Sequence, residues 1–239
     1  MPGENNQIPI LSQQLLLGLA EELKTPLQQI ARRAELGAMT GKIEPLEIQS
    51  IADSALKLID NYALGVRLSM VPEELEIEAV SVSSVLYDAC QQLDKMAKNY
   101  GVELQMSIAG RFGPVAAHRQ GLQAALVSLG SALIEALPAT GANNQQLCLK
   151  LATHRSRYGI VAGVYSDTKK LTNDALVQAR KLQAVSRQPL INVSHTSGAG
   201  VFVADAILKS MNLNLTASRH QSLYGLGTVL QPNHQMQLV

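Results

Sequence analysis

The residues best suited to chemistry stand close together in a short segment, 21–27, which reads EELKTPL. It holds two carboxylates, Glu21 and Glu22, and one hydroxyl, Thr25. Because an α-helix turns every 3.6 residues, positions 21 and 25 lie one turn apart on the same helix face. From there the Thr25 hydroxyl could orient a water molecule against a group bound beside the helix. The proline that follows offers a simpler interpretation, in which Thr25 stands where the helix bends.

The pattern around this segment predicts two helices. Apolar residues recur at spacings of three and four from Gln13 to Leu36, and again after Pro45, with a break at Gly37. Two such helices joined by a short turn form an αα-hairpin over 1–72. Each apolar stripe is wider than one neighbouring helix covers, so we expect a homodimer in which two hairpins form a four-helix bundle. The stripes are Leu16, Leu19, Leu23, Leu27, Ile30 and Ala34 in the first helix, and Ile48, Ile51, Ala55, Leu58, Tyr62 and Val66 in the second.

The rest of the chain, 73–239, mixes helical and strand patterns after Pro72 and a cluster of acidic residues end the helical period. Helices that pack on one face of a mixed sheet form an α/β sandwich, so the predicted fold class is α+β, a hairpin followed by a sandwich. We expect helices over 82–100, 120–137 and 199–212, and strands over 101–108, 146–153, 158–165, 213–218 and 227–232.

Composition excludes several function classes. The 239 residues carry a net charge of +1 with 3% aromatic residues, which gives neither a basic field nor stacking platforms for nucleic acid. Cys90 and Cys148 match no metal-ligand spacing and are interpreted as buried free thiols, so no metal site is predicted. The apolar run near the N-terminus is far shorter than the ~20 residues of a membrane span. We therefore expect a cytoplasmic protein with no membrane span.

The segment 21–27 resembles the motif His-Glu-Leu-Arg-Thr-Pro-Leu of bacterial sensor histidine kinases. Six of seven positions fit if Lys24 counts for arginine, and the exception is Glu21 at the place of the phosphoacceptor histidine. The resemblance runs from about Leu11 to Pro232 and implies a dimerisation and phosphotransfer hairpin followed by an ATP-binding domain. Phosphotransfer in that family needs a neutral imidazole nitrogen, so autophosphorylation at Glu21 is not expected. Glu21 is either an electrostatic mimic of phosphohistidine or a solvated surface glutamate.

The expected magnesium-binding helix also lacks residues that kinase chemistry needs in that family. The family pattern Asn-Leu-Leu-x-Asn-Ala-x-Lys is read here as SLGSALIE, with Ser128 and Ala132 at the two asparagines and Glu135 at the lysine. Alanine offers no ligand to a cation that demands oxygen coordination. Glu135 also places a negative charge where the family has a positive one. The resemblance thus implies weak or no binding of ATP or ADP, and no cofactor is expected.

Two further boxes of the nucleotide site are partly kept. In the family's Asp-x-Gly-x-Gly box, Asp167 remains, while Lys169 and Leu171 replace the glycines that permit close approach of the nucleotide. An aspartate after a strand is also a common turn residue or helix cap. Gly198 and Gly200 of the last glycine box remain before an apolar helix, where free backbone N–H groups could bind an anion. A tight junction between a loop and a helix has the same appearance.

These residues favour a catalytically inactive histidine-kinase-like protein of two-component signalling. Its hairpin would bind a response regulator or a partner kinase. The alternative function is a response-regulator phosphatase, because many family members use Glu-x-x-Thr for this reaction and Glu22 and Thr25 match that pair. A third is a nucleotide-gated conformational switch. The docking surface below the motif is expected to hold the solvent-facing residues Gln28, Gln29, Arg32 and Arg33.

Overall fold

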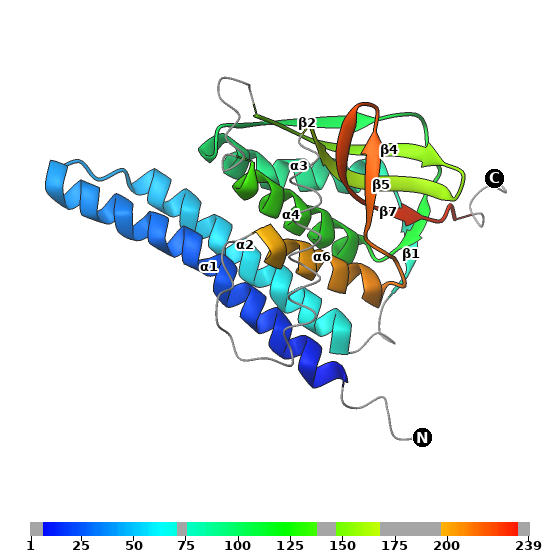
Figure 1. Ribbon diagram of the computed structural model, residues 1–239, viewed down its shortest axis with the longest axis horizontal. Helices are drawn as coiled ribbons and strands as arrows, with labels where there is room; N and C mark the ends of the chain where they lie inside the picture. Colours follow the sequence, from blue (N-terminus) through cyan, green and yellow to red (C-terminus); the bar gives the residue numbers. More distant parts are fainter. Residues whose placement is uncertain (1–6, 71–75, 138–146, 168–196, 234–239) are drawn as a thin grey trace.

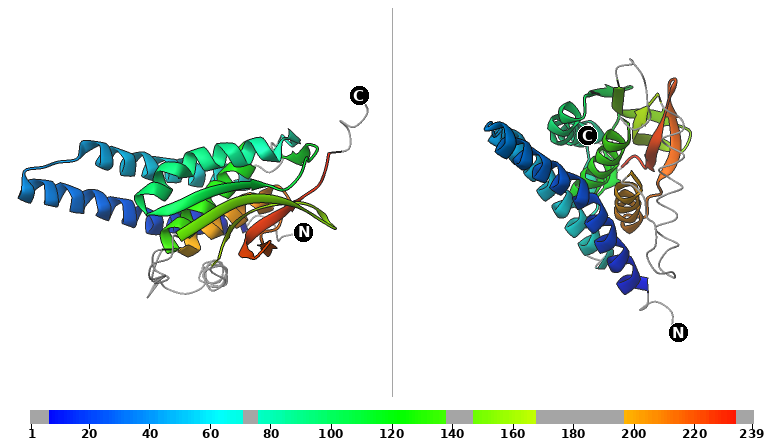
Figure 2. Two further views of the ribbon diagram at one scale, coloured as in Figure 1. Left: turned by 90° about the horizontal axis from the view of Figure 1, so that it is seen from above. Right: turned by 60° about the vertical axis from the view of Figure 1, so that its left-hand side comes forward.

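The structure is a computed structural model that describes residues 7–70, 76–137, 147–167 and 197–233 (Figure 1). Its elements form three layers, namely a helical hairpin, a middle layer of helices and a five-stranded sheet (Figure 2). The helices are α1 (Gln7–Thr40), α2 (Pro45–Met70), α3 (Val82–Asn99), α4 (Arg119–Ala136) and α6 (Ser197–Ser210). The strands are β1 (Glu78–Val80), β2 (Val102–Ile108), β3 (Val115–Ala117), β4 (Leu147–Ser156), β5 (Gly159–Ser166), β6 (Thr216–His220) and β7 (Leu223–Leu230).

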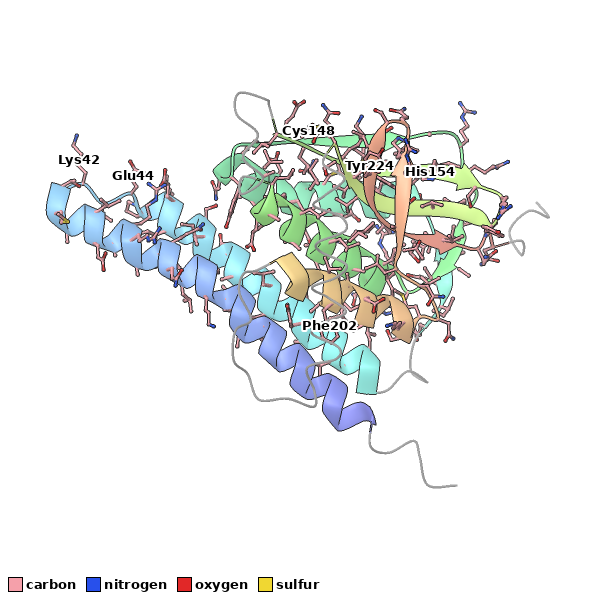
Figure 3. The ribbon with its side chains drawn as sticks, in the orientation of Figure 1. Lys42, Glu44, Cys148, His154, Phe202 and Tyr224 are labelled. Atoms are coloured by element: carbon pink, nitrogen blue, oxygen red, sulfur yellow. The ribbon has the colours of Figure 1, made fainter. Side chains whose placement is uncertain are left out.

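Helices α1 and α2 pack side by side along the hairpin, as the periodicity predicts. Gly41 ends α1 with φ 69°, a left-handed conformation that favours glycine, and Pro45 opens α2 with the fixed φ that suits a first helical residue. The turn carries Lys42 and Glu44 at the tip of the hairpin, far from the sheet (Figure 3). Helix α1 is longer than predicted and continues through Pro26.

The five-stranded sheet has the order β2-β4-β5-β7-β6. Strands β2 and β4 are parallel, and the other neighbouring pairs are antiparallel. The predicted helices and strands of this region are all present within a few residues of their expected bounds, but a small sheet of β1 and β3 was not predicted. These two strands have three residues each, which is too short for an alternating pattern. We call the whole region from α3 to β7 the sandwich.

Helix α4 lies at the centre of the sandwich. Nearly all of its side chains from Gly121 to Ile134 are buried, because the sheet, α3, α6 and α2 surround it. Its first turn is capped by His118, whose Nδ1 accepts a hydrogen bond of 3.0 Å from the backbone N–H of Gly121. Helix α6 lies beside α4 and contributes Phe202, which is 1% exposed, to the same core (Figure 3).

The sheet face away from the helices also buries side chains. The ring of Tyr165 lies against Gly163, Gly225 and Gly227, where any Cβ would overlap its atoms or the neighbouring backbone. Its hydroxyl donates a hydrogen bond of 3.3 Å to Ser218. The two edge strands approach each other on this face, since Ser107 Oγ of β2 lies 3.4 Å from His220 Nε2 of β6. The sheet is therefore curled around a small second core.

The hairpin packs directly against the middle layer of helices. Ala55, Leu58 and Tyr62 of α2 are buried within this single chain. Gly65 allows close approach to α6, because a Cβ at this position would lie 3.2 Å from Cγ1 of Ile207. Part of the α2 stripe that was expected to face a second copy is thus covered by the chain's own sandwich. The division at residue 72 stays a prediction.

Within the described residues, no helix combines the length and the apolar character that crossing a membrane would require.

Candidate functional site

A small cavity lies between the hairpin and the sandwich, beside their direct packing contacts, and we call it the junction cavity. Its volume is about 40 Å³, and four helices contribute to its walls. Residues of the motif helix α1 and of the C-terminal half of α4 both line it, although the two segments are far apart in sequence. The lining residues are Pro26 and Gln29 of α1; Ile51, Ala55, Leu58 and Asn61 of α2; Gln92, Leu93, Met96, Asn99 and Tyr100 of α3 and its C-cap; and Val127, Ser131 and Glu135 of α4.

One hydrogen bond crosses the mouth of the junction cavity. The side-chain amide of Gln29 donates to the hydroxyl of Tyr100 over 3.0 Å. Burial, and to a lesser degree the charge of Glu135, raise the pKa of Tyr100 to about 12, so its hydroxyl keeps its proton at neutral pH. Gln29 was expected to face solvent as part of a docking surface. The structure corrects this expectation, because Gln29 is half-buried and bonded to the sandwich.

Glu135 is the carboxyl group in the wall of the junction cavity. Burial disfavours its charged form and raises its pKa to about 7. Among the described residues it has no ion pair or hydrogen bond that would stabilise the carboxylate. Sequence reasoning treated Glu135 as a lost phosphate-binding lysine. The structure places it in the wall of a cavity that Pro26 of the motif helix also lines, and this arrangement was not predicted.

The two positions that match the family's asparagines are buried in α4. Ala132 is 1% exposed and forms part of the hydrophobic core. Ser128 is equally buried, and its hydroxyl has no hydrogen-bond partner within the described part of the chain. One buried hydroxyl and one methyl group are a poor donor set for a magnesium ion. In the parts of the chain that the structure describes, no group of three or more histidine, cysteine or acidic residues could hold a metal.

The predicted phosphatase pair lies on α1. The backbone is helical throughout 21–27, so Glu22 and Thr25 lie three residues apart on one uninterrupted helix. The side chains of Glu21, Glu22 and Thr25 fall outside the described part of the structure. Pro26, the next residue, is buried against the junction cavity. The roles of these three residues stay predictions.

The residues that were expected to remain from a nucleotide site lie at two other places. Asp167 is exposed immediately after β5, and Lys169 and Leu171 lie outside the described residues. The expected loop before the apolar helix is corrected: α6 begins at Ser197, so Gly198 and Gly200 lie inside its first turn. The N–H groups of a first helical turn lack intrahelical acceptors, which keeps anion binding possible in principle. None of Asp167, Gly198 and Gly200 lines the junction cavity.

A wider cleft of about 480 Å³ opens beside the junction cavity, and we call it the outer cleft. Arg33 pairs there with Glu47 over 2.7 Å, and Lys98 pairs with Asp94 over 2.6 Å. Arg32 is exposed and forms no ion pair with any described residue. The lining residues are Gln29, Arg32, Arg33, Leu36, Glu47, Ile51, Lys98, Asn99 and Tyr100.

Solved structures with a similar arrangement are histidine kinases. The chain matches the Acinetobacter baumannii histidine kinase AdeS with a TM-score of 0.51 and 15% identity, over 89% of this chain and 98% of that one. It also matches full-length ShkA in complex with AMPPNP, with a TM-score of 0.52 and 12% identity, over 95% of this chain and 46% of that one. The chain has a histidine-kinase-like fold. No family model and no curated protein matches its sequence.

The histidine-kinase-like fold was predicted from motifs, whereas the junction cavity was not. A signal for it was nevertheless present in the sequence. Glu135 is the one charged residue in an otherwise apolar and small-residue stretch, 121–137, whose helix had to be buried on most sides. A carboxyl group in such a helix needs either solvent or a polar wall. In this histidine-kinase-like fold the polar wall comes from the hairpin and α3.

Proposed function

We propose that this chain is a catalytically inactive histidine-kinase-like protein of two-component signalling. It does not autophosphorylate and binds ATP or ADP weakly or not at all. It docks a response regulator or a partner kinase through the α1–α2 hairpin. The observation that carries the proposal is the burial of Ala132 in the core of α4, at the place where a family member has a magnesium-binding asparagine.

The neighbouring groups on α4 support the loss of nucleotide binding. The buried hydroxyl of Ser128 is a single weak ligand for a hard cation. When Glu135 is ionised, its carboxylate repels the phosphates of a nucleotide that approaches this end of α4. Glu21 in place of the phosphoacceptor removes the nucleophile as well. Each change weakens a different step of kinase chemistry.

The hairpin retains the features of a docking module. Gln28, Arg32 and Arg33 of α1 are exposed, and Arg32, which pairs with no acidic residue in the described part of the chain, has a positive charge that suits an acidic partner surface. The hairpin also exposes large apolar side chains, which we assign to contact with a second copy in a four-helix bundle. These exposed side chains are Leu27, Leu36, Met39, Ile43, Leu46, Leu56 and Ile59.

Calorimetric titration with ATP and with ADP, each with and without Mg²⁺, tests the nucleotide part of the proposal. We expect no heat of binding at millimolar nucleotide. The control variant restores the family residues as Ala132→Asn combined with Glu135→Lys, and should gain measurable binding if these positions are responsible. Micromolar binding by the natural chain would contradict the proposal and favour a nucleotide-gated switch.

Binding of a panel of purified receiver domains, measured by microscale thermophoresis, tests the docking part. Charge reversal at Arg32 should weaken a detected interaction by roughly tenfold, the size of a lost charge-assisted contact. Arg67→Glu on α2 serves as the matched control, because Arg67 is an exposed arginine of the same hairpin outside the outer cleft. An equal loss in both variants would show non-specific electrostatic binding instead.

A second candidate function is dephosphorylation of the docked regulator. It is favoured by the continuous helix through 21–27, which keeps Glu22 and Thr25 at their predicted spacing. In this reaction the Thr25 hydroxyl orients a water molecule against an aspartyl phosphate, and the partner supplies the Mg²⁺. Thr25→Ala should abolish dephosphorylation and preserve docking, while Thr40→Ala at the end of the same helix should change neither. Unchanged dephosphorylation in Thr25→Ala would exclude this function.

A further inference from the structure

We propose that the contact between the hairpin and the sandwich is a proton-controlled latch. The hairpin is held against the sandwich when the Glu135 carboxyl carries a proton, and this contact weakens when Glu135 is ionised. The inference rests on the proposed function in one respect, namely that the hairpin is the surface on which a partner docks.

The position of Glu135 places it in a cavity that both parts of the chain line. It belongs to α4 of the sandwich, yet it shares the junction cavity with Pro26 and Gln29 of α1 and with Asn61 of α2. The cavity exceeds the roughly 10–15 Å³ that a water molecule needs, and its wall is polar. Asn61 Nδ2 is buried without a hydrogen-bond partner among the described residues. A protonated Glu135 and the Asn61 amide can both be satisfied there by water.

Among the described residues that line the junction cavity, none carries a positive charge that would compensate an ionised Glu135. On the side of α1 and α2 the lining residues are neutral, and on the side of α3 the titratable group is Tyr100, which stays neutral well above pH 7. Helix α6 contributes no described residue to the wall. The surrounding cations line the outer cleft instead, where Arg33 and Lys98 have their own acidic partners and Arg32 is exposed to solvent.

The direction in which pH changes the closure of the hairpin follows from the raised pKa of Glu135. Burial at the junction raises the pKa of Glu135 from 4.5 to about 7, so the closed arrangement binds a proton that a solvated carboxyl would release. The stabilisation of the closed arrangement is fully present below pH 4.5 and is lost as the pH rises through 7. Between pH 6 and pH 8 the equilibrium constant for closure should fall roughly tenfold.

Opening of the latch would change what the hairpin presents. In the closed arrangement the Gln29 side of α1 faces Tyr100, and Pro26 is buried. Release of the sandwich exposes this side of α1 next to Gln28, Arg32 and Arg33. A partner that contacts the Gln29 side of α1 together with its exposed arginines would therefore bind better above neutral pH than below it.

Hydrogen–deuterium exchange followed by mass spectrometry tests the latch in the whole chain, without nucleotide or partner. Glu135→Gln mimics the protonated carboxyl at every pH. Because the stabilisation is fully present only below pH 4.5, peptides from 24–34 and 92–100 should exchange faster in the natural chain than in Glu135→Gln at both pH 6 and pH 8, and the ratio of the two rates should be about tenfold larger at pH 8 than at pH 6. Glu35→Gln is the matched control, since Glu35 is an exposed glutamate of α1. The exchange rates of this control should equal those of the natural chain at both pH 6 and pH 8.

Equal exchange in the natural chain and in Glu135→Gln at both pH values would overturn the latch, and so would an equal difference at pH 6 and pH 8. If Glu135→Gln fails to fold, ¹³C NMR of the glutamate carboxyls in the natural chain decides. A carboxyl that is assigned to Glu135 and titrates near 7 supports the latch, and one that titrates near 4.5 excludes it. Failure of the docking function would show in the receiver-domain experiment and would leave these results unchanged.

Discussion

The side-chain amide of Gln29 and the hydroxyl of Tyr100 are joined by a hydrogen bond of 3.0 Å that links α1 to the C-cap of α3. Tyr100→Phe removes the acceptor and leaves the half-buried Gln29 amide without this partner. We expect the free energy of unfolding, measured by urea denaturation, to fall by about 1 kcal/mol. Tyr87→Phe is the matched control, because Tyr87 is an exposed tyrosine of α3. Equal stability of Tyr100→Phe and the natural chain would show that the bond contributes nothing.

Gly65 sets the distance between the hairpin and α6. A Cβ at this position would lie 3.2 Å from Ile207 Cγ1 and 3.8 Å from Val203 Cγ1, so a branched side chain has no room. Gly65→Val should lower the free energy of unfolding by about 1–3 kcal/mol through overpacking, although valine is a better helix former than glycine. Gly113→Ala, where an added Cβ meets nothing within 4 Å, is the control. A stabilised Gly65→Val variant would contradict the close packing of α2 on α6.

A second copy of the chain should cover the exposed apolar face of α2. Leu56 is 59% exposed and Ile59 is 37% exposed, one turn apart on the helix. The double change Leu56→Glu and Ile59→Glu should convert the proposed dimer into a monomer in light scattering behind size exclusion. Tyr158→Glu removes a comparably exposed apolar side chain from the sandwich and should leave the mass unchanged. A natural chain that is already monomeric at high micromolar concentration would exclude the four-helix bundle.

The second core of the sheet should be sensitive to acid. The centroids of the His154 and His220 rings lie 5.3 Å apart, and burial lowers the pKa of both imidazoles. The charges of His154 and Lys150 lower the pKa of His220 further. The folded state therefore binds fewer protons than the unfolded chain, and stability falls as the pH drops below about 6.5. The double change to glutamine should flatten the fall of unfolding free energy between pH 7 and pH 5. An unchanged slope would show that the two histidines do not titrate on unfolding.

The sequence allowed the elements to be predicted because most of them carry long, clean periodicity. Helix α2 begins at Pro45 as expected, and α3 and α4 agree with their expected bounds within a residue or two. The strands β1 and β3 carry no such signal, since three residues cannot show alternation. The presence of the longer helices and strands could thus be predicted from local patterns. The pairing of the short strands β1 and β3 could not, because it depends on tertiary contacts.

The candidate site was also predicted only in part. The substitutions at Glu21, Ala132 and Glu135 were visible because the family motif supplied a register for them. The cavity that Glu135 shares with the hairpin could not be predicted, because an apolar stripe indicates that a face is buried and does not indicate which element covers it. The α2 stripe was assigned to a second copy, yet Leu58 and Tyr62 are buried within the chain itself.

The strand order has a consequence for biosynthesis. In the completed sheet β5 lies between β4 and β7, and β7 is synthesised after all the other described strands. Until residues 223–230 have left the ribosome, β5 is an unpaired sheet edge, and Tyr165 lacks the glycines of β7 against which its ring packs. A nascent chain that is terminated early would expose this edge to other chains. Pairing with β7 therefore covers the edge of β5 through which an incomplete chain could pair with other chains.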